Sequence, residues 1–239
     1  MFRYTGLHGF LIWFHLLLFT MWLGADMGVY YAHRFILLRE RSVDARLVAA
    51  QIMRGIDLLP RLAMALFLAS GTTLIAVDPL GHRFAGAPLA AVWVGTTGWV
   101  AVTVYLFVRG DPATGRLHRA VATVDRYGRV VLAVGLIGVA TYTLAAPHPF
   151  GVNTNPRWLG AKVLLYALCI LLALGIEANL RPFGAAFTEL VTTGSSPDVE
   201  HRLRRSLRRC IPYVYLLWAC VAAAALLGVM KPGAHIPGS

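Results

Sequence analysis

Five polar or aromatic residues follow one face of the first apolar segment of the chain. His8, His15 and Trp22 are spaced seven residues apart, and Asp26 and His33 are again separated by seven. On an α-helix, seven residues return the chain to within about 20° of its starting direction, and the eleven residues from His15 to Asp26 do the same. The spacing predicts a polar stripe that lipid cannot solvate, so the stripe must face protein or a cavity.

These side chains suit ligation or proton transfer. Imidazole at membrane depth can bind haem iron or copper, or hydrogen-bond to a quinone. His15 lies about 10–12 Å inside the outer edge of the segment by helix rise, where both ring nitrogens need partners. We predict that His15 is a metal ligand, with His8 as a second ligand or hydrogen-bond partner and Trp22 as a cofactor contact. For Asp26, a structural ion pair and a catalytic proton relay both fit the sequence.

Two further charges fall inside the fifth apolar segment. Lys162 lies near its start, at the same outer depth as His8 and His15, and Glu177 lies near its other end. We predict that Lys162 acts on an anionic group, although its long stem could instead carry the ammonium to the headgroups. Glu177 is predicted to pair with Arg181, four residues further along. The predicted site therefore lies in the outer leaflet.

Other metal ligands are poorly placed in the sequence. The methionines of the apolar segments have no Met-rich outer loop beside them, which gives copper weak support. The remaining histidines fall in predicted loops or the tail: His82, His118, His148, His201 and His235. The three cysteines, Cys169, Cys210 and Cys220, have no CxxC spacing and are predicted to be small packing residues.

The elements that must position these residues are transmembrane helices. The chain is 58% hydrophobic and 14% charged, with a mean hydropathy of +0.65, which is typical of membrane proteins. Six segments are long enough to cross a hydrocarbon core of roughly 30 Å. They lie near 8–31, 61–78, 88–108, 128–146, 158–179 and 211–230. We predict an all-α integral membrane protein, a six-helix bundle that forms a single domain over 1–239.

The distribution of positive charge predicts the orientation. The net charge of +11 would suggest nucleic acid as a partner of a soluble protein, but here three loops hold most of the Lys and Arg residues. These loops follow the first, third and fifth spans. The positive-inside rule places them in the cytoplasm and both termini outside. We therefore predict the lipid bilayer as a partner, and no nucleic acid.

The arginine-rich loops carry helix signals. Ser42 is placed to cap a helix that ends at Pro60, and Ser196 to cap a second helix over 197–209. We interpret the basic face of 197–209 as a surface held near anionic headgroups. A partner-docking element is the alternative.

The segment "HLLLFTMWLG", from His15 to Gly24, resembles the first span of the HemJ/CopD-like membrane superfamily. "WLGAKVLLYALCILL", which includes Lys162, is similar to the later HemJ span that opens with an aromatic residue and an inward lysine. The resemblance covers two of six spans and implies that His15 binds haem and that Lys162 is functional. HemJ proteins have fewer spans and CopD proteins more, and the basic signature after the first HemJ span is replaced here by "YYAHRFILLRER".

Together these observations predict a haem-binding redox protein of the bacterial inner membrane, with haem b as cofactor. Lys162 would offset a porphyrin propionate or an anionic substrate, and a quinone or a partner subunit would exchange electrons. Enzymatic oxidoreduction and association into homo-oligomers are left open. Two alternatives remain: a CopD-like copper or proton-coupled transporter, and a non-catalytic anchor subunit that binds a partner through the basic helices.

Overall fold

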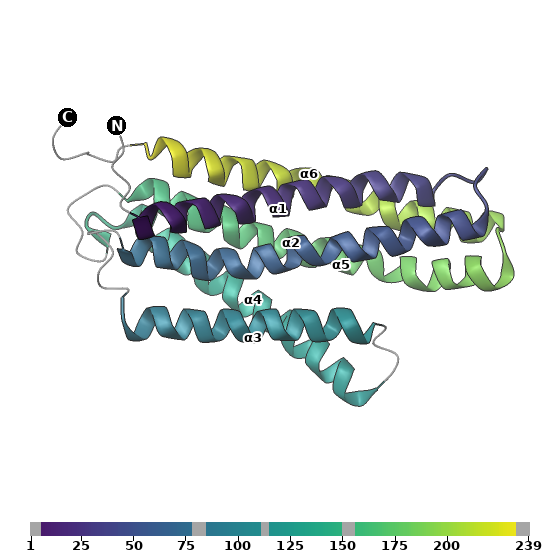
Figure 1. Ribbon diagram of the computed structural model, residues 1–239, viewed down its shortest axis with the longest axis horizontal. Coiled ribbons are helices and arrows are strands. Elements are labelled where there is room, and N and C mark those ends of the chain that lie inside the picture. The colour runs from purple at the N-terminus through teal and green to yellow at the C-terminus, as the bar shows by residue number, and fades with distance from the viewer. Residues whose placement is uncertain (1–5, 78–84, 111–114, 150–155, 233–239) are drawn as a thin grey trace. The chain divides into compact units, whose positions relative to one another are not determined.

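The computed structural model describes residues 6–77, 85–110, 115–149 and 156–232. Within them the chain forms six α-helices and no strand (Figure 1). The helices are α1 (Gly6–Ile36), α2 (Val43–Val77), α3 (Ala87–Arg109), α4 (Arg116–Ala145), α5 (Arg157–Thr193) and α6 (Pro197–Met230). Each is long and apolar enough to cross a membrane. This confirms the predicted all-α class with six membrane-spanning helices, and the protein is a multi-pass membrane protein.

Several helices are longer than the apolar segments, because the capped helices of the connecting loops join the spans without a break. The Ser42 hydroxyl accepts a hydrogen bond from the Ala45 amide, and that of Ser196 accepts one from Val199, each at 3.3 Å. Both predicted caps are confirmed. The predicted helix end at Pro60 is wrong: α2 continues through Pro60. A proline removes one intrahelical hydrogen bond, but the helix continues here around a proline that is itself buried.

The residues divide into two compact units, each described here by itself. Unit 1 comprises 1–32 and 51–125, and unit 2 comprises 33–50 and 126–239. The boundaries fall inside α1, α2 and α4, where the chain has no flexible linker. The single domain predicted over 1–239 stays a prediction.

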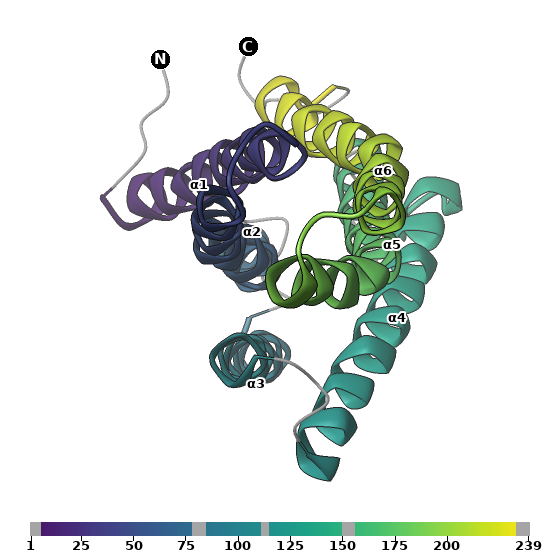
Figure 2. The same cartoon turned by 90° about the vertical axis from the view of Figure 1, so that its right-hand side faces the viewer.

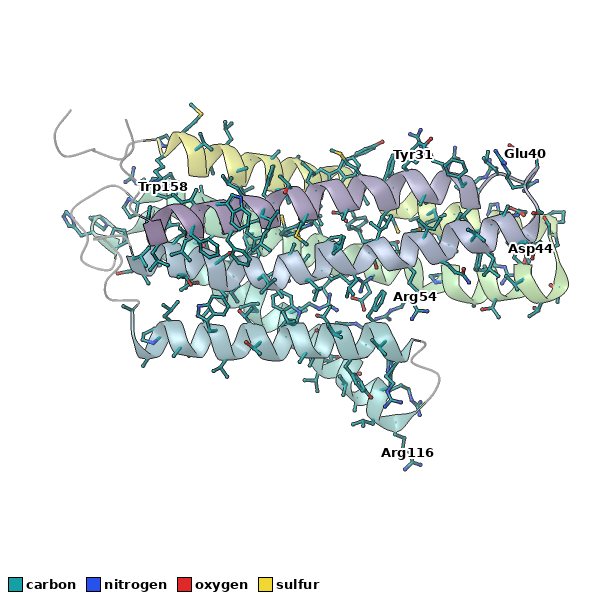
Figure 3. The ribbon with its side chains drawn as sticks, in the orientation of Figure 1. Tyr31, Glu40, Asp44, Arg54, Arg116 and Trp158 are labelled. Atoms are coloured by element: carbon teal, nitrogen blue, oxygen red, sulfur yellow. The ribbon has the colours of Figure 1, made fainter. Side chains whose placement is uncertain are left out.

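In unit 1, α2 and α3 run antiparallel. At one end the Trp93 indole donates to the Thr73 hydroxyl at 3.0 Å. At the other, the Arg54 guanidinium donates to the Phe107 carbonyl at 2.8 Å and lies 5.5 Å from the centre of the Phe107 ring (Figure 3). Arg54 therefore caps the C-terminal end of α3, where backbone carbonyls lack helical partners.

In unit 2, α5 and α6 form a long antiparallel hairpin, visible side by side in Figures 1 and 2. The chain reverses at Gly194, whose φ of 90° suits glycine. Further along, the Ser206 hydroxyl donates to the Asn179 carbonyl at 2.6 Å, and the Tyr213 ring packs directly on the backbone at Gly175. The predicted packing role of the three cysteines agrees with the structure, in which all of them are buried.

The helix α4 packs antiparallel to α5 in the same unit. At one end Arg129 donates to Glu177 at 2.7 Å, and Arg126 lies 3.8 Å from the same carboxylate. At the other end Gly160 of α5 fits against the side chain of Thr143. From the sequence, Glu177 was predicted to form an ion pair with Arg181 on its own helix. The pairing with arginines of α4 was not predicted, because the i,i+4 rule applies only to residues of one helix.

A buried ion pair joins the α1–α2 connection to the start of α6 within unit 2. Arg46 donates to both carboxylate oxygens of Glu200, at 2.6 and 3.1 Å, and to the Ile36 carbonyl at 2.7 Å. The Ser195 hydroxyl donates to Glu200 at 2.7 Å. Arg46 is 1% exposed and Glu200 3%. Such burial is tolerated because the guanidinium and carboxylate meet in a bidentate geometry with their remaining groups hydrogen-bonded.

An apolar core lies between the end of α5 and the start of α6, outside the predicted membrane segments. It consists of Ala186, Leu190, Val199 and Leu203, with Leu37, Phe183 and Phe187 packed against it. The end of α5 and the start of α6 therefore form a helical hairpin with a core of its own. The ion pair between Arg46 and Glu200 connects the start of α2 to this hairpin.

We expect this end of unit 2 to lose stability in acid. Burial alone would raise the pKa of Glu200, but hydrogen bonds from Arg46 and Ser195 and the charges of Arg46 and Arg39 outweigh it, so the pKa lies below its ordinary value of 4.5. The stabilisation is complete above pH 4.5 and is lost as the pH falls through the lowered pKa of the folded state. Between these limits the protonation of Glu200 lowers the free energy of unfolding by about 1.4 kcal/mol for each pH unit of acidification.

The check is a pH series of unfolding midpoints for the wild type and Glu200→Gln. The variant cannot titrate at this position, so its stability should fall less steeply below pH 4.5. Parallel curves for the two proteins would contradict the assignment.

Candidate functional site

His15 is held in unit 1 by residues of α2. Its Nδ1 lies 2.8 Å from the Ser70 hydroxyl, and its ring meets that of Phe67 edge to face, with centroids 4.5 Å apart. A Cβ placed on Gly71 would lie 3.6 Å from His15 Cε1, so the imidazole is in van der Waals reach of the α2 backbone. The prediction that His15 faces protein is confirmed.

The Ser70 hydroxyl links His15 to the backbone of α2. It lies 2.8 Å from Nδ1 of His15 and 3.4 Å from the Phe67 carbonyl oxygen. A neutral imidazole carries its proton on one nitrogen and a lone pair on the other. With the proton on Nδ1, His15 would donate to Ser70 and keep its lone pair on Nε2.

Trp22 lies about two turns further along the same face of α1. It is 2% exposed, and its ring lies 5.5 Å from that of Phe67, centroid to centroid, at a tilt of 50°. Phe67 is therefore packed by both His15 and Trp22. This brings together two of the predicted site residues through a residue that the sequence analysis did not single out.

His8 and Asp26 lie on α1, on either side of this contact along the helix. Both are half-buried and belong to unit 1. Four apolar residues of α1 are also buried: Leu18, Ala25, Ala32 and Ile36. The stripe thus runs beside the face that α1 buries in protein, which agrees with the exclusion of ionisable groups from lipid.

Lys162 lies in unit 2, against the last turns of α6. A Cβ placed on Gly228 would lie 2.7 Å from the Lys162 ammonium, so the absence of a side chain at Gly228 makes room for it. Close by, Lys231 ends α6 and its ammonium lies 5.6 Å from the centre of the Trp158 ring; Trp158 is labelled at the start of α5 in Figure 3. Two cations and an interfacial aromatic residue therefore gather at this end of the hairpin. His15 belongs to unit 1.

Ser70 and Phe67 are the site residues that sequence reasoning missed. Ser70 is a lone small polar residue in "LFLASG" of α2 and is 1% exposed. A buried hydroxyl needs a partner, which was a signal, but nothing in the sequence identified that partner as His15.

His118 lies in the predicted loop after the third span, which is helical and forms the first turn of α4 from Arg116. Its burial was not predicted: it is 6% exposed, with its ring 5.9 Å from that of Tyr105. His201 lies in α6, within the helix predicted over 197–209. His82 and His235 lie outside the described residues.

Over the described ranges, no three His, Cys, Asp or Glu side chains meet in a group that could hold a metal ion. At His15 a single imidazole is hydrogen-bonded to the Ser70 hydroxyl. Comparison with protein-family models, with curated proteins and with solved structures gave no match.

Proposed function

We propose that this chain is a haem-binding redox protein of a bacterial inner membrane, with both termini outside. It would transfer electrons between haem b and a quinone or a partner subunit, or oxidise a porphyrinogen directly. Porphyrins and quinones both partition into the apolar phase, which accounts for the membrane location.

The observation that carries the proposal is the oriented imidazole of His15. Histidines that bind metals donate their second N–H to an acceptor, which fixes the tautomer and makes the ligating nitrogen more basic. The hydrogen bond between His15 Nδ1 and the Ser70 hydroxyl would have this form with the proton on Nδ1. It lies within an apolar helix, where a polar side chain is costly unless it has a function or a partner.

His15 would hold the haem iron through its imidazole, and Phe67 and Trp22 would supply apolar ring surface beside it. Bound haem would supply one-electron chemistry. His8 as a second ligand, Asp26 as a proton relay and Lys162 as the partner of an anionic group remain predictions.

The test is an absorption spectrum of the detergent-purified protein, oxidised and then reduced with dithionite, after expression with ample haem. The wild type should show a Soret band and a reduced α band, and His15→Ala should lose both. His201→Ala is the matched control, because His201 is exposed on α6, and it should keep the wild-type spectrum.

Ser70→Ala tests the orienting bond separately. Loss of the acceptor from Nδ1–H should weaken haem retention by about 10–100-fold. It should also raise the midpoint potential of the haem that remains, because a less basic imidazole stabilises ferric iron less. Unchanged retention and potential would show that the bond only packs α1 against α2.

A featureless spectrum from the wild type would overturn the haem proposal. Metal-dependent or proton-dependent uptake into vesicles would then test the transporter alternative. If His15→Ala leaves every activity intact, the anchor-subunit alternative is favoured.

A further inference from the structure

The α6 helix presents a dense arginine face just before it becomes apolar. His201, Arg204, Arg205, Arg208 and Arg209 line a shallow hollow of about 460 Å³. All five side chains are exposed. From Arg204 to Arg209 the helix rises only about 7.5 Å, so four guanidinium groups share little more than one turn of helix. We call these five residues the α6 arginine face.

Four carboxylates of unit 2 are already engaged by other arginines. Arg46 and Arg39 lie on Glu200, Arg129 and Arg126 on Glu177, and Arg202 on Glu189 and Asp198. Within the part of the chain that the structure describes, none of the four arginines of the α6 arginine face takes part in an ion pair. Their charge therefore remains available to an external anion.

The backbone beneath these arginines is fixed by packing. Leu203, Ser206, Leu207 and Cys210 alternate with them along α6 and are buried, with Ser206 and Cys210 bonded to carbonyls of α5. A helix anchored on one side holds its exposed arginines at set spacings, which lowers the entropic cost of binding.

The position along the helix indicates which anion fits. The apolar run of α6 begins at Ile211, and Tyr213 and Tyr215 follow it with exposed rings. Tyrosines at this level typically mark the membrane interface. The α6 arginine face is therefore expected at the level of the lipid phosphates, and guanidinium binds phosphate in a bidentate manner.

We propose that the α6 arginine face is a binding site for the phosphates of anionic phospholipids in the predicted cytoplasmic leaflet. It gives this end of the α5–α6 hairpin a fixed lipid contact, independently of any haem in unit 1. The general attraction of positive loops to the membrane does not require a discrete site. Binding at the α6 arginine face, in contrast, depends on these particular arginines.

The experiment is native mass spectrometry of the full chain in detergent, titrated with phosphatidylglycerol, cardiolipin or phosphatidylcholine. The wild type should retain the two anionic lipids in preference to phosphatidylcholine. Arg204→Gln/Arg205→Gln should weaken their binding about tenfold to thirtyfold, because two charge-assisted guanidinium–phosphate contacts are lost together. Arg208→Gln/Arg209→Gln should have a similar effect.

The matched control is Arg116→Gln/Arg119→Gln on α4, which removes the same charge from two exposed arginines in a second arginine-rich loop. Its lipid binding should change less than threefold. Equal losses in the α4 and α6 variants would overturn the proposal in favour of diffuse surface charge. Inorganic phosphate should not displace the lipid at equal phosphate concentration, and displacement would show that the site takes free phosphate. Circular dichroism of each variant checks that the helices are intact.

Discussion

Replacing Arg46 with methionine is expected to destabilise the protein by about 3–5 kcal/mol. The substitution leaves the Glu200 carboxylate, which is 3% exposed, without the bidentate partner that compensates its burial. It also removes the donor to the Ile36 carbonyl. The measurement is the unfolding midpoint in mixed micelles of dodecyl maltoside and sodium dodecyl sulfate, followed by circular dichroism.

Arg39→Met is the matched control for this result. Arg39 lies 3.7 Å from the same carboxylate, but its side chain is 55% exposed, so its loss should cost less than about 1 kcal/mol. A double variant, Arg46→Met with Glu200→Leu, should recover much of the stability, because no buried charge then remains. If Arg46→Met and Arg39→Met have equal effects, the ion pair does not hold this end of unit 2 together.

Gly160→Leu is expected to destabilise the packing of α4 against α5 by about 3 kcal/mol. A Cβ at Gly160 alone would lie 3.1 Å from both Cβ and Cγ2 of Thr143 and 3.2 Å from Cγ of Leu144. Thr143 is buried and cannot turn away without breaking its hydrogen bond to the Val139 carbonyl. The helices must therefore separate, which removes the close approach that small residues allow in membrane proteins.

Gly138→Leu on α4 controls for the effect of leucine on a helix. A Cβ at Gly138 would meet no atom within 4 Å, so the substitution should stay within about 1 kcal/mol of wild type and be stabilising if anything. Both variants are measured by the same unfolding assay. Equal midpoints for the two would mean that the α4–α5 interface is looser than the contacts at Gly160 indicate.

The features that could be predicted from sequence are those that a single helix expresses by itself. The caps at Ser42 and Ser196 were found because capping depends on a local side chain and its own first turn. His15 was expected to face protein because the stripe is a property of one helix and its solvent. The end assigned at Pro60 was wrong for the complementary reason: a local rule for proline was overruled by packing around a buried residue.

The residues that complete the site could not be predicted in the same way. Ser70 and Phe67 lie more than fifty residues from His15, and Arg46 lies 154 residues from Glu200. Periodicity gives the buried face of each helix, but not which neighbour covers it, at what axial offset or with what rotation. His118 shows the same limit, since burial of the first turn of α4 depends on what packs beside it.

The sequence by itself determined the six membrane-spanning helices, their caps and the protein-facing position of His15. Each of these follows from the free energy of one segment in lipid or water, which the residues of that segment largely set. Only the tertiary structure decided that Ser70 orients His15, that Glu200 is neutralised by Arg46, and that the α6 arginines keep their charge exposed. Those outcomes depend on which side chains satisfy one another across helices, and that is a property of packing rather than of composition.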